Sequence, residues 1–104
     1  MGQEKELVGK TLEQIEQNME LFYQQKTSEA LGEFQQVLTE LIKMVDILFE
    51  YRDNHDGFSL DEEKMKNALT EAMNALEEGD LILLADVIQY EFVEYVKELL
   101  NMME

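Results

Sequence analysis

Cysteine and proline are missing from this chain of 104 residues, and histidine occurs once, at His55. The absence of cysteine excludes disulfides and thiol nucleophiles, and it suits a cytoplasmic protein. A single histidine leaves little scope for general-base catalysis or for imidazole ligation of a metal. Serine and threonine are few, and no glycine-rich phosphate-binding motif is present. We therefore expect a non-enzymatic cytoplasmic protein without a cofactor.

Basic residues are also scarce, because eight Lys and Arg stand against 24 Asp and Glu, for a formal net charge of −16. Such a chain repels nucleic acids and anionic membrane surfaces. The most apolar stretch, residues 81–100, is interrupted by Asp86, Glu91 and Lys97. It therefore predicts a buried helix and not a membrane span. We expect neither nucleic acid nor a membrane among the partners.

Apolar residues recur at spacings of three and four along four stretches, which is the period of amphipathic helices. With 45% apolar and 31% charged residues, the composition fits a folded chain of one domain. The predicted fold is all-α, an antiparallel four-helix bundle of two helical hairpins over residues 1–104. A three-helix bundle with the first helix detached is the alternative. Residues 1–10 are expected to be loose, and helices are expected near 11–25, 28–52, 60–78 and 80–102.

Helix-capping residues indicate where these helices begin and end. Ser28 is expected to cap the second helix, and Ser59 with Glu62 has the capping-box spacing for the third. Gly79 is expected to end the third helix, and Asp80 to cap the fourth. These signals predict short turns, as in two hairpins.

The polar turn that contains Gly57 resembles a calcium-binding loop in part. When Gly57 takes the sixth position of an EF-hand loop, Asn54, Asp56 and Glu63 fall on ligand positions. Arg52 then takes the first position, where an acidic ligand is required, and its charge repels the ion. We expect an ordinary interhelical turn with no metal, and calcium binding by Asn54, Asp56 and Glu63 is the alternative.

Two of the predicted helices carry more apolar residues than one face of a small bundle buries. The additional rows either fill the edges of a monomer core or form an interaction surface, as a homodimer interface or a groove for a partner helix. Methionines add side chains that adapt to varied partners. The predicted partner-binding residues are Ile82, Val93, Val96, Leu100, Met103, Met44 and Tyr51.

The stretch from Leu69 to Glu94, with its Glu-Glu-Gly-Asp turn over residues 77–80, is similar to the last hairpin of flagellar and type III export chaperones. The similarity rests on hydrophobic spacing and transfers no individual residue. It implies a small acidic cytoplasmic protein that holds a helix of its partner. We therefore predict an adaptor or chaperone-like protein that binds another protein through apolar helix faces. A structural homodimer and a calcium-binding bundle are the alternatives.

Overall fold

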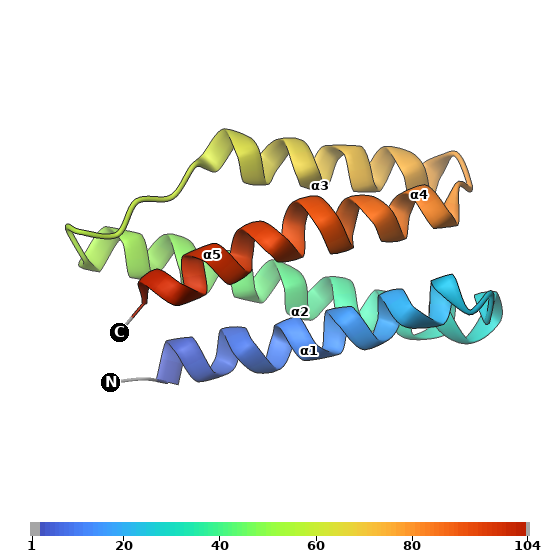
Figure 1. The fold of residues 1–104 in the computed structure, drawn as a ribbon, viewed down its shortest axis with the longest axis horizontal. Coiled ribbons are helices and arrows are strands. Elements are labelled where there is room, and N and C mark those ends of the chain that lie inside the picture. Colours follow the sequence, from blue (N-terminus) through green and yellow to red (C-terminus); the bar gives the residue numbers. More distant parts are fainter. Residues whose placement is uncertain (1–2, 104) are drawn as a thin grey trace.

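A computed structural model describes residues 3–103 of the chain, and these residues form a helical bundle. Helices α1 and α2 form one antiparallel hairpin, and α3 forms the second with a continuous final rod of α4, η1 and α5 (Figure 1). The segment η1 is a π-helix. The predicted all-α bundle of two hairpins is confirmed. The elements are α1 (Gln3–Tyr23), α2 (Thr27–Asn54), α3 (Glu62–Glu77), α4 (Leu81–Asp86), η1 (Val87–Val93) and α5 (Glu94–Met102).

The two hairpins meet mainly through α1, which packs against all three parts of the final rod. Within each hairpin, α1 packs along α2, and α3 packs along α4 and η1. Over residues 3–103, α2 and α3 make almost no close backbone contact with each other. The two hairpins are therefore held together along α1 and the final rod, and not along α2 and α3.

Helix α1 begins at Gln3, earlier than the sequence suggested. The expectation that residues 3–10 are loose is wrong, and residues 1–2 lie outside the described part of the chain. The physical reason is Val8, which continues the spacing of Leu12 and Ile15 by one turn and is fully buried. Burial of this side chain stabilises the first turns of the helix.

The turn between α3 and α4 is a Schellman motif centred on Gly79, as the sequence predicted. Gly79 has a φ of 74°, and its N–H donates to the carbonyl of Leu76 at 3.1 Å. The N–H of Asp80 donates to the carbonyl of Ala75 at 2.9 Å. The Asp80 carboxylate then caps α4 by accepting from the N–H of Leu83 at 3.1 Å.

The same motif ends α1, but there a glutamine takes the glycine position. Gln25 has a φ of 61°, and its N–H donates to the carbonyl of Phe22 at 3.0 Å, while the N–H of Lys26 donates to that of Leu21. The next helix then starts before Ser28, with Lys26 at its N-cap and no side-chain cap bond. The expectation that Ser28 caps α2 is wrong. The tight turn lets α2 begin at Thr27, so Ser28 already lies inside the helix.

The connection from α2 to α3 is longer than the other two turns. Its Phe58 is buried, with its ring edge-on to the Tyr51 ring at a centroid distance of 4.9 Å. This anchored side chain keeps the backbone extended past Ser59, so the predicted capping by Ser59 is wrong. The N-cap of α3 is instead Asp61, whose carboxylate accepts from the N–H of Lys64 at 3.1 Å.

Candidate functional site

Most of the residues predicted to bind a partner lie in the core. Ile82 remains accessible, at 46% exposure, and Leu100 is half-buried. The prediction of an exposed position is wrong for the other members of the set, and a surface in this conformation has to be built from different residues. The buried members are Met44, Tyr51, Val93, Val96 and Met103.

The π-helix explains why the second apolar row of the last helix is core. Its hydrogen bonds run from residue i to residue i+5, so the rotation about the helix axis per residue is smaller in η1 than in an α-helix. Beyond η1 the buried stripe therefore moves from the row that contains Tyr95 to the row that contains Val96. A constant period of 3.6 predicts Tyr95 inside, whereas the structure leaves it half-buried and buries Val96 completely.

On α2 the apolar surplus lies on the flank opposite to the expected one. The flank with Met44 and Tyr51 is buried in the hairpin that α1 forms with α2. The other flank carries Ile42, Val45 and Phe49, and these side chains are exposed or half-buried. The sequence shows both flanks, but it does not show which one its neighbour covers.

An apolar groove of about 500 Å³ opens between α2 and α3. Its surface comes from apolar side chains of both helices, with charged and polar groups near its edges. Ile42, at 53% exposure, lies one helical turn before Val45 and extends the apolar edge of α2. The lining residues are Val45, Phe49, Glu62, Met65, Lys66, Leu69, Thr70, Met73 and Asn74.

The distribution of side-chain size on α3 accounts for this groove. The face of α3 turned into the bundle carries Ala68, Ala72 and Ala75, all buried. Small side chains let α3 approach the final rod closely, because interaxial distance follows the side chains at the contact. The larger Leu69 and Met73 point instead toward α2 and are only half-buried. Alanine therefore draws α3 toward the rod and leaves space on its other side.

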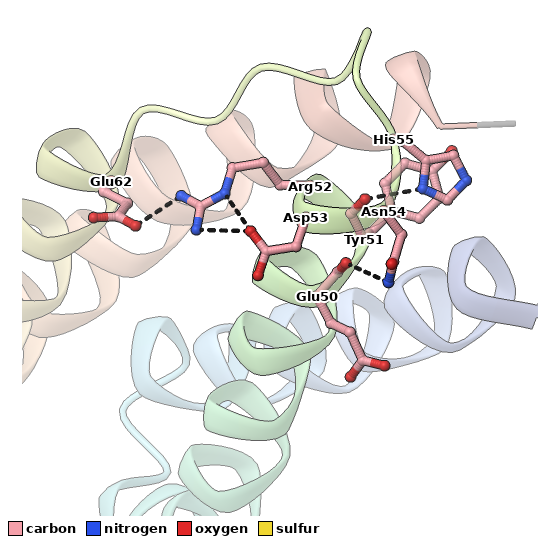
Figure 2. A network of polar contacts seen from close by, with 7 residues as sticks. All are labelled: Glu50, Tyr51, Arg52, Asp53, Asn54, His55 and Glu62. Carbon is pink, nitrogen blue, oxygen red and sulfur yellow. Dashed lines mark hydrogen bonds and ion pairs between the residues drawn. The ribbon is translucent and has the colours of Figure 1, made fainter.

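One end of the groove is crossed by an ion pair between α2 and α3, drawn in Figure 2. The Arg52 guanidinium donates from Nη1 to Glu62 Oε1 at 2.7 Å and lies 3.4 Å from Asp53 Oδ1. Its Cζ atom also lies 5.1 Å from the centroid of the Phe49 ring, in a cation–π contact. Arginine is always protonated in proteins, and the hydrogen bond to Glu62 raises the pKa of Arg52 further. This end of the groove therefore holds a cation with two acidic partners.

The sole histidine and the calcium candidates lie beside this network. The His55 ring stacks on Tyr51 at a centroid distance of 3.7 Å, and its Nδ1 lies 2.9 Å from the Tyr51 carbonyl oxygen. The Asn54 amide donates to the carbonyl of Glu50 at 3.0 Å, within its own helix. Asp56 and Glu63 are exposed. Among residues 3–103, no three or more His, Cys, Asp or Glu side chains group in a way that could hold a metal ion.

None of the helices in the described range is both long and apolar enough to cross a bilayer.

Comparison with known proteins gives a family and no further relationship. Searches of curated proteins and of solved structures find no match. One family profile matches residues 1–102, and its description is "Domain of unknown function (DUF8042)". The chain thus belongs to the DUF8042 family.

Proposed function

We propose that this chain is a non-enzymatic cytoplasmic adaptor or chaperone-like protein, and that it binds another protein by holding one of its amphipathic helices in the α2–α3 groove. The groove itself is the observation that carries the proposal. Apolar side chains of two helices face each other there without a third element of residues 3–103 between them. Contiguous exposed apolar surface on a small acidic protein favours an interaction site.

The length of the groove fits a helix of the partner. Along α3 its lining extends from Glu62 to Asn74, which is about 18 Å at the helical rise of 1.5 Å per residue. Helices that bind in such grooves use apolar anchors at positions i, i+3 or i+4, and i+7, which cover about 10 Å. A helical segment of about three turns therefore matches the length of the groove.

Methionine gives the groove a deformable surface. Met65 lies at its base and Met73 at its side. Unbranched thioether side chains repack around anchors of different shape at low energetic cost. This composition suits a protein that accepts a helix of a partner better than it suits a rigid pocket for one small molecule.

Site-specific cross-linking tests the proposal. A photoreactive benzoylphenylalanine replaces Lys66, which lines the groove, and in a matched control it replaces Leu7, which is exposed on α1. After irradiation in a lysate of the source organism, mass spectrometry identifies both the attached protein and the attached segment. We expect Lys66 to attach an amphipathic helical segment of one protein that Leu7 does not attach.

Two results would contradict the proposal. Attachment of the same set of proteins from both positions would show that the groove has no selectivity. Attachment of a second copy of this chain at position 66, with a dimer seen by light scattering, would make the groove a homodimer interface. Circular dichroism of both substituted proteins shows whether the bundle is intact in each experiment.

A further inference from the structure

We infer that the helix bound in the groove is basic, with lysine or arginine beside its apolar anchors, and that Asp46 and Glu77 on the edges of the groove select it. This inference rests on the proposed function and specifies the chemistry of the partner. The two exposed carboxylates lie on a chain whose formal net charge is −16.

The α2 edge of the groove is acidic beyond its apolar row. Asp46 follows Ile42 by four residues and precedes Phe49 by three, so the three residues share one side of the helix. Asp46 is exposed. A cationic side chain that flanks an apolar anchor in the groove can therefore reach the Asp46 carboxylate while the anchor packs on Phe49.

The α3 edge has the same arrangement at its far end. Glu77 follows Met73 by four residues and is exposed. Lys66 is the basic residue among those that line the groove, and Arg52 at the groove end is already paired with Glu62 and Asp53. Acidic groups therefore predominate around the apolar surface.

The charge of the whole chain acts in the same direction. A formal net charge of −16 attracts a basic segment and repels an acidic one. It also repels a second copy of this chain, which carries the same charge. Charges at the edge of an interface act mainly on the association rate and on the choice of partner, and salt screens them.

Two synthetic 16-residue peptides test the inference by fluorescence anisotropy. Both carry leucine at i, i+3, i+4 and i+7 spacing, and the remaining charged positions are all lysine in one and all glutamate in the other. A third peptide has the lysine composition with the leucines rearranged so that they share no face. At low ionic strength we expect the lysine peptide to bind at least tenfold more tightly than the other two, and we expect added salt to reduce this ratio.

A matched pair of isoleucine variants tests whether binding occurs in the groove. Ile42→Glu changes the apolar edge of the groove, and Ile82→Glu changes a residue of similar exposure on α4. Each adds one negative charge, which by itself strengthens attraction of the lysine peptide. We expect Ile42→Glu to weaken binding at least fivefold and Ile82→Glu to leave it within twofold.

A matched pair of double variants tests the selecting carboxylates. Asp46→Lys with Glu77→Lys alters the groove edges, whereas Glu13→Lys with Glu33→Lys makes the same change in net charge at other exposed positions. We expect the ratio of the affinities for the lysine peptide and the glutamate peptide to fall at least threefold further in the first double variant than in the second. Equal effects of the two pairs would overturn the role of Asp46 and Glu77.

The outcomes separate this inference from the proposed function. Equal affinity for the lysine and glutamate peptides, with both weakened by Ile42→Glu, overturns the inference and leaves the groove as the binding site. Binding that Ile42→Glu does not weaken, equal binding of the rearranged peptide, or no binding of any peptide at millimolar concentration contradicts both. A wild-type dimer that Ile42→Glu dissociates assigns the groove to a second copy and also overturns both.

Discussion

The hydroxyl of Tyr23 donates a hydrogen bond of 2.6 Å to Asp86 Oδ1. Tyr23 ends α1 and Asp86 ends α4, immediately before the π-helix. The bond therefore joins the first hairpin to the second at the point where the helical period of the final rod changes. Burial, followed by the hydrogen bond and the charge of Asp86, raises the pKa of the Tyr23 hydroxyl above its usual range.

Removing this hydroxyl should destabilise the bundle. In Tyr23→Phe the Asp86 carboxylate loses a charge-assisted hydrogen bond in a partly buried position, so we expect the free energy of unfolding to fall by about 1–2 kcal/mol. Urea denaturation measures the change. Tyr90→Phe, at a tyrosine that is 66% exposed, is the control and should stay within about 0.5 kcal/mol of wild type. Equal losses in the two variants would contradict a specific role for the bond.

The same bond predicts a dependence of stability on alkaline pH. Because the pKa of Tyr23 is raised in the folded state, the folded protein holds this proton more tightly than the unfolded chain does. The contribution to stability is complete below the usual pKa of 10.0 and is lost as pH rises from there through the folded value. Wild type should lose more stability than Tyr23→Phe between pH 9.5 and pH 11. Parallel curves for the two proteins would show that Tyr23 does not cause the decline.

The buried row on the final rod gives a prediction about folding. Val93 and Val96 are fully buried, so aspartate at both positions places two carboxylates in the core. We expect Val93→Asp with Val96→Asp to lose its helical circular dichroism at 25 °C, because burial of one unpaired charge already costs several kcal/mol. Ile82→Asp should keep its helical signal. A helical double variant would show that this row lies on the surface, as the predicted partner-binding role of Val93 and Val96 requires.

The two Schellman turns predict substitutions of opposite sign. Gln25 holds a φ of 61° with a side chain, so Gln25→Gly should stabilise the protein by about 0.5–1 kcal/mol. Gly79→Ala should destabilise it by about 1 kcal/mol, since its φ is 74°. Gly32→Ala is the control for the second change, because Gly32 lies within α2 with open space around it, and alanine there should stabilise. Thermal unfolding measures all three, and a stabilising Gly79→Ala would contradict the assignment of the turn.

These positions show what the sequence could predict. Residue spacing identified the helices and the two hairpins, and glycine chemistry identified the turn at Gly79. The turn at Gln25 gave no such signal, because its motif uses a residue that is rarely left-handed. The predicted caps at Ser28 and Ser59 were wrong for two reasons. The tight turn starts α2 before Ser28, and the buried Phe58 delays the start of α3 until after Ser59.

The sequence predicted the kind of site, but it did not predict most of the residues that form it. Surplus apolar residues indicated a surface that binds a helix, but the choice of residues failed at two tertiary features. The π-helix rotates Val96 into the core, and no periodicity in the sequence marks where the helical period changes. The position of α1 decides that Met44 is covered and that Phe49 faces the groove. Both features depend on packing between segments distant in the chain.

Methionine methyl resonances provide the most direct measurement of groove binding. The protein is labelled with ¹³C at the methionine methyl groups and titrated with the lysine peptide described above. Met65 and Met73 line the groove, Met19 and Met44 are buried elsewhere in the core, and Met102 is 49% exposed on α5. We predict that the Met65 and Met73 signals shift together with one dissociation constant while the Met19 and Met102 signals stay in place. Shifts at Met102 without shifts at Met73 would place the peptide outside the groove and contradict the account.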